Sequence, residues 1–442
     1  MVKPLRMGLI GFGNIGSGVI QALRDNRDLL DARCPRPLEL RRVADVDLER
    51  PRPIEVDRNL LTTDAKAIIG APDIDVVIEL IGGLEPARTL VESALRAGKH
   101  VVTANKAMLA HHGAELLALA AQKRVRLLFE AAVGGGMPVI RALTECLAAN
   151  RITRIEGILN GTCNYILNQI GGGESFEEAL SDAKKNGYAE PDPTADVESV
   201  DAANKIAILA SLAFGLDIRY DDVYREGITK ITPGDMVWAQ EERFVIKQYA
   251  LAEMDEEGRV AVIVRPALLS WPHHPLAGVG LVLNGVLISG FPVGRIQLAG
   301  PGAGPQPTAS AVLGDLMWLS QFDNEQSPPP PFLTIPVGKR PKKKADYKSD
   351  GYWLRIQSRR QEERSAATVT QILARYGISI GKISEICWED RRRGDKSGPI
   401  RVIQVHTDKS SEESVRRVVS EIEAAKITEM PDGVVCLPRF LW

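Results

Sequence analysis

Cysteine is scarce in this chain of 442 residues, and the five that occur are scattered along it. Their number is odd and no two are closely spaced, which argues against a disulfide framework and against a cysteine-rich metal site. Apolar runs of about 18 residues, long enough to span a membrane, are also absent. The start, MVKPLRMGLIGFG, lacks a signal-peptide core with a cleavage site. These absences predict a cytoplasmic protein without a membrane partner.

An excess of charge of one sign is missing as well. The chain has 55 lysine and arginine residues against 57 aspartate and glutamate residues, so its formal net charge is −2. No overall field therefore favours nucleic acid as a partner. The hydrophobic share of 44% and the charged share of 25% are those of a soluble globular protein. The length predicts two or three domains, and we expect a small-molecule substrate.

A glycine-rich motif near the N-terminus indicates dinucleotide binding. A short buried strand is expected over residues 6–10, and a helix is expected to run through Leu23. Between them lie Gly11, Phe12, Gly13, Asn14, Ile15 and Gly16. This is G-x-G-x-x-G in the strand-to-helix context that it requires. Gly11 allows the tight turn, Gly13 lets the backbone approach a pyrophosphate, and Gly16 lets helix and strand pack closely. The alternative is a glycine-rich turn without a ligand.

Further buried strands are predicted after this motif. Residues 74–81 form an almost continuous apolar run that ends in Gly82 and Gly83. Such a run suits a parallel strand covered on both faces, with a ligand-facing loop at its carboxyl end. Lys106 follows the next strand end, where a surface lysine with a buried stem is an equally good interpretation. These features predict an N-terminal α/β domain of the Rossmann type over residues 1–150.

The expected strand at 38–46 bears on the choice between NAD and NADP. Asp45 or Asp47 at its end could accept a hydrogen bond from the ribose 2′-hydroxyl, which favours NAD. Arginines nearby could instead meet the 2′-phosphate of NADP. These are Arg41, Arg42, Arg50 and Arg52.

Residues 183–205 combine a loop with the start of a helix. Gly187 and two prolines favour the loop. A helix is expected to begin at Pro193 and to continue to Phe214. Asp201 and Lys205 are four residues apart and therefore share one helix face, while Glu190 precedes the helix. Two carboxylates and one ammonium group thus converge, although an exposed ion pair worth roughly 0.3–0.5 kcal/mol is the simpler interpretation.

The order of residues in this stretch resembles the signature of homoserine dehydrogenases. Ser199 departs from it, because the family usually has glycine there. The runs that end at Lys106, begin at Asn160 and span 300–312 are similar to family runs too. The resemblance implies NAD(P)-dependent interconversion of L-homoserine and L-aspartate 4-semialdehyde. There are two alternatives. One is a non-catalytic protein that senses a dinucleotide and an amino acid, and the other is a dehydrogenase of another amino-acid aldehyde.

The resemblance also implies roles for single residues. Glu190 and Asp201 hold homoserine, and Lys205 handles the proton with Lys106 as its partner or alternative. Lys106 is also implied to lie near the nicotinamide and the substrate. Beside the glycine motif, the implied cofactor contacts are Ile81, Gly82, Lys106, Gly187 and Gly302. Family members that use NADP often carry arginine just before the aspartate of the 38–47 segment. Val46 at that place favours NAD.

A monovalent cation, sodium or potassium, is a further implication. Its ligands would be the Glu130 carboxylate and the backbone carbonyls of Val133, Gly135 and Met137. Carbonyl oxygens with one carboxylate suit a hard, weakly charged ion. The alternative is an ordinary glycine-rich crossover.

The sequence predicts three domains and one linker. Residues 1–150 form the dinucleotide-binding domain, to which 300–322 return. Residues 151–299 form an α+β substrate and dimerisation domain, 323–350 a linker, and 351–442 a C-terminal domain. The tail has the β-α-β-β-α-β order of a ferredoxin-like fold and resembles an ACT domain, often a threonine sensor. Its first loop, 359–364, is highly charged and lacks the glycine usual there. The family resemblance implies a homodimer or homotetramer.

Overall fold

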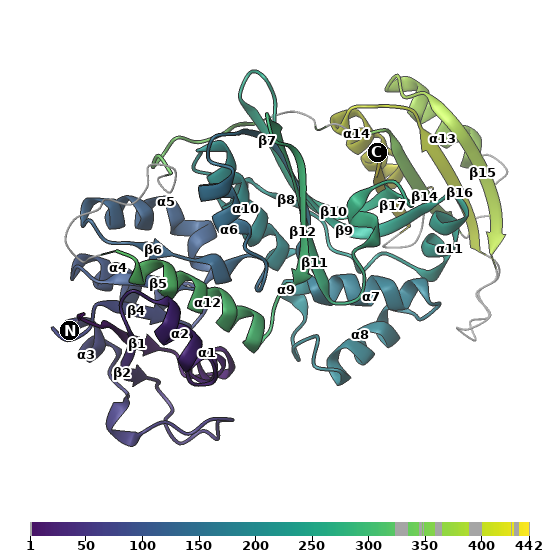
Figure 1. Ribbon diagram of the computed structural model, residues 1–442. Coiled ribbons are helices and arrows are strands. Elements are labelled where there is room, and N and C mark those ends of the chain that lie inside the picture. Colours follow the sequence, from purple (N-terminus) through teal and green to yellow (C-terminus); the bar gives the residue numbers. More distant parts are fainter. Residues whose placement is uncertain are drawn as a thin grey trace.

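The computed structural model describes residues 2–322, 335–343, 347, 349–358, 365–388, 400–425, 427 and 433–441. Two sheets organise this part of the chain. Figure 1 shows the N-terminal sheet at one end, long strands in the middle and the C-terminal elements at the other end. Every helix of the described residues is too short or too polar to cross a lipid bilayer.

The first sheet is parallel, with the strand order β3-β2-β1-β4-β5-β6. Its elements are β1 (Leu5–Ile10), α1 (Asn14–Asp25), α2 (Arg27–Arg33), β2 (Leu38–Ala44), β3 (Leu61–Thr62), α3 (Ala65–Gly70), β4 (Val76–Glu79), α4 (Ala87–Arg96), β5 (His100–Thr103), α5 (Lys106–Gln122) and β6 (Leu127–Leu128). The predicted α/β architecture is therefore present. β4 is shorter than the predicted 74–81, because the Glu79 carboxylate accepts the N–H groups of Ile81 and Gly82 and ends the strand.

The second sheet is mixed and mostly antiparallel in its first half, in the order β12-β11-β7-β9-β10. Its strands and covering helices are β7 (Arg151–Ile158), α7 (Gly161–Gly171), α8 (Phe176–Lys185), α9 (Thr194–Val197), α10 (Val200–Phe214), β8 (Tyr224–Arg225), α11 (Pro233–Glu241), β9 (Phe244–Met254), β10 (Arg259–Ser270), β11 (Leu283–Phe291) and β12 (Gly294–Pro301). Between the sheets lies α6 (Val139–Arg141).

The chain then returns to the first sheet through α12 (Pro305–Ser320). Val312 and Leu316 of this helix are fully buried in one core cluster with Val19 and Ile20 of α1. Figure 1 shows α12 beside α1, although the two helices are far apart in the sequence. The end of the second sheet is therefore tied directly to the helix that follows the glycine-rich loop.

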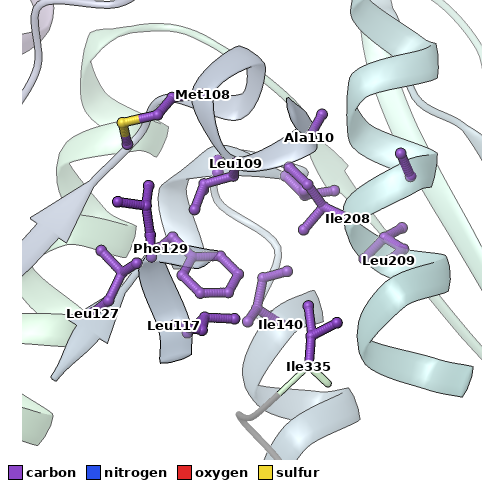
Figure 2. Close-up of a cluster of buried hydrophobic side chains, with 14 of the residues drawn as sticks. Met108, Leu109, Ala110, Leu117, Leu127, Phe129, Ile140, Ile208, Leu209 and Ile335 are labelled. Atoms are coloured by element: carbon purple, nitrogen blue, oxygen red, sulfur yellow. The ribbon is translucent and has the colours of Figure 1, made fainter. Parts of the chain in front are cut away.

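Helices α5 and α10 pack against each other through a shared apolar core. Figure 2 shows Leu109 and Leu117 of α5 facing Ile208 and Leu209 of α10. Ile335, from the segment after α12, closes this cluster and is 7% exposed. This packing holds the two helices in a fixed relation. Lys106 begins α5 and Asp201 lies in the first turn of α10, and both belong to the predicted site.

The C-terminal elements continue the second sheet in the order β17-β14-β16-β15. They are β13 (Lys342–Lys343), β14 (Tyr352–Ser358), α13 (Ser365–Arg375), β15 (Ile380–Trp388), β16 (Ile400–Thr407), α14 (Glu412–Ala424) and β17 (Val434–Phe440). From β14 on, the predicted β-α-β-β-α-β order is present. β17 pairs in parallel with β10, which joins the tail to the middle of the molecule. The charged loop at 359–364 lies outside the described residues.

Buried polar and aromatic contacts reinforce this junction. Arg355 of β14 forms an ion pair with Asp235 of α11 at 2.6 Å, and both side chains are nearly inaccessible to solvent. The ring of Trp353 stacks on that of Trp238 with their centroids 4.1 Å apart. Since an ion pair excluded from water is costly to break, the tail is an integral part of the fold.

Replacing Asp235 with alanine should therefore destabilise the protein strongly. The variant leaves Arg355 buried without its carboxylate, and we expect a loss of roughly 3–5 kcal/mol of unfolding free energy. Denaturant unfolding followed by tryptophan fluorescence measures it. Glu242→Ala is the matched control, because it removes a more exposed ion pair with Lys382 and should cost no more than about 1 kcal/mol. Equal losses in the two variants would contradict the prediction.

Candidate active site

The glycine-rich loop lies between β1 and α1, in the predicted place. Gly11 has φ = 103°, and a Cβ atom there would come within 2.6 Å of the Leu80 carbonyl carbon. A Cβ at Gly13 would meet nothing within 4 Å, so the backbone is open to a ligand at this residue. The first backbone bond of α1 runs from Ser17 N–H to Gly13 O. The N–H groups before it are therefore left for an anion. This loop fits a dinucleotide pyrophosphate.

An aspartate and an arginine meet at the tip of the same loop. The Asp45 carboxylate accepts the Phe12 N–H at 2.7 Å. Arg52 donates to the Phe12 carbonyl at 2.7 Å, lies over the Phe12 ring and is 3.5 Å from Asp45. Val46 is 92% exposed. An acidic and a basic side chain are thus both present where an adenosine ribose would be recognised.

Two lysines share one carboxylate where α5 and α10 begin. Lys106 is the first residue of α5, and its Nζ is 2.8 Å from Asp201 Oδ1. Lys205 lies one turn after Asp201 on α10, and its Nζ donates to Asp201 Oδ2 at 2.7 Å. Three residues selected from the sequence therefore form one cluster, although Lys106 is far from the other two along the chain. We call Lys106, Asp201 and Lys205 the lysine–aspartate cluster.

The side chains of Asn160 and Asp196 complete the surroundings of Asp201, and no functional role was predicted for either of them. Asn160 Nδ2 donates to Asp201 Oδ2 at 2.9 Å and to Asp196 Oδ1 at 2.6 Å. Asn160 Oδ1 caps α7 by accepting the Cys163 N–H. The family-like run that begins at Asn160 was the available signal in the sequence, but it reveals nothing about a distant carboxylate. Lys205 also donates to the Leu159 carbonyl at 2.8 Å.

The two lysines differ in their electrostatic surroundings. Burial lowers the pKa of Lys205, although Asp201 opposes this effect. Lys106 is half-exposed, and the charge of Asp201 raises its pKa. Burial would raise the pKa of Asp201, but the ammonium groups of Lys205 and Lys106 outweigh it and hold the pKa well below its usual range. The cluster therefore contains one lysine that stays charged and one that releases its proton more readily.

The helix predicted to begin at Pro193 is interrupted, which corrects the sequence-based expectation. The short α9 ends at Val197, Ser199 takes a left-handed conformation with φ = 64°, and α10 begins at Val200. This break turns the chain so that Asp196 and Asp201 reach the same Asn160 amide. A continuous helix was predicted because serine is not an obvious breaker.

Other predicted site residues lie around the cluster or apart from it. Glu190 is exposed before α9, and its side chain forms no hydrogen bond or ion pair with another residue in the described part of the chain. Gly187 is exposed in the same loop with φ = 73°. Ile81 and Gly82 follow β4, at the carboxyl end of the first sheet. Gly302 packs against Asn284, which donates to the same Leu159 carbonyl as Lys205.

The loop predicted to hold a cation is mostly buried and already hydrogen-bonded. The two carboxylate oxygens of Glu130 accept the N–H groups of Ile140 and Arg141, each at 2.8 Å. Burial raises the pKa of Glu130. The Met137 carbonyl accepts the Val139 N–H. Three acidic, histidine or cysteine side chains do not gather at a common point in the described residues, so a cation here would depend on backbone carbonyls.

Comparisons with known proteins agree with this geometry. The family model for homoserine dehydrogenase matches residues 138–317, and the model for the homoserine dehydrogenase NAD-binding domain matches residues 11–130. A homoserine dehydrogenase of Bacillus subtilis is 36% identical over 96% of this chain and 97% of its own. That of Synechocystis sp. is 45% identical over 71% of this chain and 72% of its own.

Solved structures extend the similarity to the whole fold. The crystal structure of a homoserine dehydrogenase from Thiobacillus denitrificans has a TM-score of 0.87 at 35% identity and covers 99% of both chains. That of the S. aureus enzyme has a TM-score of 0.75 at 28% identity and covers both chains completely. With its dinucleotide loop and its lysine–aspartate cluster, the chain belongs to the homoserine dehydrogenase family of NAD(P)-dependent oxidoreductases.

Proposed function

We propose that Lys205 exchanges the proton in the interconversion of L-homoserine and L-aspartate 4-semialdehyde. One observation carries this assignment: Asp201 bridges two lysines whose pKa values are moved in opposite directions. A general acid or base works best when its pKa lies near the working pH. Lys205 meets this condition better than Lys106, because burial favours its neutral form.

The contacts of Lys205 leave one of its N–H groups for the substrate. An ammonium group has three donors, and among the described residues that of Lys205 donates to Asp201 and to the Leu159 carbonyl. In the oxidative direction neutral Lys205 takes the proton of the substrate hydroxyl, and in the reductive direction charged Lys205 returns it. When bound, the nicotinamide ring carries the hydride.

Charged groups near the cluster are suited to the two ends of an amino acid. We assign the substrate amino group to Glu190, which is exposed in the loop before α9 and whose charge is the smallest of the causes that raise the pKa of Lys106, after that of Asp201. Lys106 stays protonated and orients Asp201 and the substrate. Asp201 fixes both lysines rather than acting as a base, since its pKa is held low.

Turnover by the purified protein tests this function. We expect homoserine-dependent reduction of the dinucleotide, and little reduction with serine or with a hydroxy acid that lacks the amino group. Equal rates with these analogues would favour a dehydrogenase of another amino-acid aldehyde. Absence of turnover, with dinucleotide binding retained, would favour a sensing protein.

We propose that the protein uses NAD at least as well as NADP. Asp45 directly follows β2, and its neighbour Val46 is not a cation. The Arg52 guanidinium does lie beside Asp45, but it is already occupied by the Phe12 carbonyl and by Asp45. We therefore expect kcat/KM for NAD to equal or exceed that for NADP. Steady-state rates with each dinucleotide measure this. A clear preference for NADP that is lost in Arg52→Ala would contradict the proposal and identify the phosphate contact.

A monovalent cation at the loop after β6 is also proposed. The Glu130 carboxylate oxygens each use one lone pair for a backbone N–H, which leaves further acceptor capacity. Two left-handed glycines, Gly134 and Gly135, turn successive backbone groups in this loop. The carbonyls of Val133, Gly135 and Met137 would supply the remaining oxygen ligands. The cation would stabilise the loop that contacts Gly302, because a Cβ at Gly135 would be 2.7 Å from the Gly302 carbonyl carbon.

The C-terminal elements are proposed to form an ACT-like domain that does not respond to threonine. Their β-α-β-β-α-β order and the strand order β17-β14-β16-β15 support the ferredoxin-like arrangement. The first loop of this domain replaces the usual glycine with charged residues, which would crowd a small zwitterion. Activity should change less than twofold with threonine up to about 10 mM, a weak-binding limit near −3 kcal/mol. Saturable inhibition below that concentration, measured with homoserine at its KM, would contradict this.

Assembly into a homodimer or homotetramer is proposed as well. The described sheet ends at the edge strand β12, whose backbone is available for pairing. Phe291, the last residue of the neighbouring strand β11, is 78% exposed. An exposed aromatic side chain beside an open edge is typical of an interface between subunits.

A further inference from the structure

Ser199 occupies the turn between α9 and α10 in a conformation that its side chain disfavours. Its φ of 64° lies in the left-handed region, where a residue with a Cβ atom is strained. The residue is completely buried. The turn brings the carboxylates of Asp196 and Asp201 to the Asn160 amide at 2.6 and 2.9 Å. The position of Asp201, and through it that of both lysines, depends on this turn.

The Ser199 hydroxyl holds the turn from two sides. Its Oγ donates to the Glu226 carbonyl at 2.7 Å and accepts from Gln248 Nε2 at 2.9 Å. Gln248 Nε2 is also 3.2 Å from the Asp196 carbonyl. The hydroxyl therefore connects the start of α10 to β9 and to the segment after β8. Glycine would adopt the same φ without strain, but it could form neither of these side-chain bonds.

Glu226, whose carbonyl accepts the Ser199 hydroxyl, is itself held by an ion pair with a buried arginine. The Glu226 carboxylate is 2.7 Å from the Arg265 guanidinium of β10. Arg265 in turn donates to Glu412, at the start of α14, at 2.7 Å. A continuous series of polar contacts thus leads from the C-terminal elements to the residue that precedes α10.

We propose that Ser199 is a positioning residue for the lysine–aspartate cluster. Its hydroxyl secures a left-handed turn against Glu226 and Gln248, and this turn sets where Asp201 stands between Lys106 and Lys205. The proposal rests on the proposed function of that cluster. It predicts an effect on the proton step, not merely on stability, although Ser199 is fully buried and its hydroxyl is bonded to Glu226 and Gln248.

Two substitutions distinguish the effect of the Ser199 hydroxyl from the effect of its left-handed backbone conformation. Ser199→Ala keeps the strain of the Cβ atom and removes both hydrogen bonds, so we expect kcat for homoserine oxidation to fall roughly 10- to 100-fold, as for a small misplacement of a reacting group. In Ser199→Ala, kcat should begin to rise at lower pH than in the wild type. The reason is that a displaced Asp201 raises the pKa of Lys205 less than a correctly placed one does. The KM for the dinucleotide should not change. Ser199→Gly removes the strain and should recover part of the lost kcat.

Ser211→Ala is the matched control. Ser211 lies on the same helix, is buried and donates its hydroxyl to the Ile218 carbonyl at 2.8 Å, but it is near the opposite end of α10. This variant should lower the melting temperature and leave kcat and its pH profile unchanged. A Ser199→Ala protein that behaves in the same way, with wild-type kcat and pH profile, would overturn the proposal.

Lys205→Ala distinguishes failure of this inference from failure of the proposed function. If Lys205→Ala is inactive and Ser199→Ala is unimpaired, Ser199 does not position the cluster. If Lys205→Ala stays active, Lys205 is not the proton carrier, whatever the result for Ser199. A loss of kcat in both variants, with the shifted pH profile in Ser199→Ala, supports both assignments.

Discussion

Lys205→Ala should lower kcat for homoserine oxidation by roughly 10²- to 10⁴-fold, the usual contribution of a positioned general base. The side chain is buried, donates to Asp201 and Leu159 O, and has its pKa lowered by burial. On the proposed role of Lys205, its removal leaves the substrate hydroxyl without a proton acceptor. Steady-state rates at saturating homoserine and dinucleotide measure the loss.

The dinucleotide loop is separate from this residue, so binding of NAD(P) to Lys205→Ala should persist. Fluorescence titration with the reduced dinucleotide checks it. Lys185→Ala is a suitable control, because Lys185 is exposed at the end of α8 and should retain full activity. A fall in kcat of less than about tenfold in Lys205→Ala would rule out the proton role.

Asp201→Asn should be the second most damaging change. It keeps the shape of the side chain but removes the charge that both lysines share at 2.7 and 2.8 Å. We expect kcat/KM for homoserine to fall by roughly 10²-fold, because Lys106 and Lys205 lose their common anchor. Asp192→Asn, an exposed change in the preceding loop, should have little effect.

The pH dependence of Asp201→Asn has a definite sign. Asp201 raises the pKa of Lys205, so its removal lowers that pKa further. We propose neutral Lys205 as the active form in the oxidative direction, so kcat should begin to rise at lower pH than in the wild type. An unchanged profile would mean that Asp201 does not act on the proton carrier.

Local features of the site could be predicted from the sequence because their causes are local. The glycine motif could be recognised because it depends on contacts between a strand, a turn and a helix that follow one another in the sequence. Its glycines are Gly11, Gly13 and Gly16. The helical period places Asp201 and Lys205 on one helix face, and they form the expected ion pair. The parallel order of the first sheet follows from alternating apolar runs and helices.

Other features depend on contacts between distant segments. Nothing in the sequence around Asn160 shows that its amide bridges Asp196 and Asp201. Ser199 carries no turn signal as strong as that of glycine, so the break between α9 and α10 was missed. The pairing of β17 with β10 joins strands from opposite sides of a long connection, and neither strand pattern indicates its partner.

The pH profile of kcat in Lys106→Ala tests the central assignment most directly, because it asks which lysine carries the proton. The Lys106 ammonium lowers the pKa of Lys205, so its removal should raise that pKa. If Lys205 is the proton carrier, the rise of kcat with pH persists in Lys106→Ala and moves to higher pH. If that ionisation disappears in Lys106→Ala and persists in Lys205→Ala, Lys106 is the proton carrier and the assignment is contradicted.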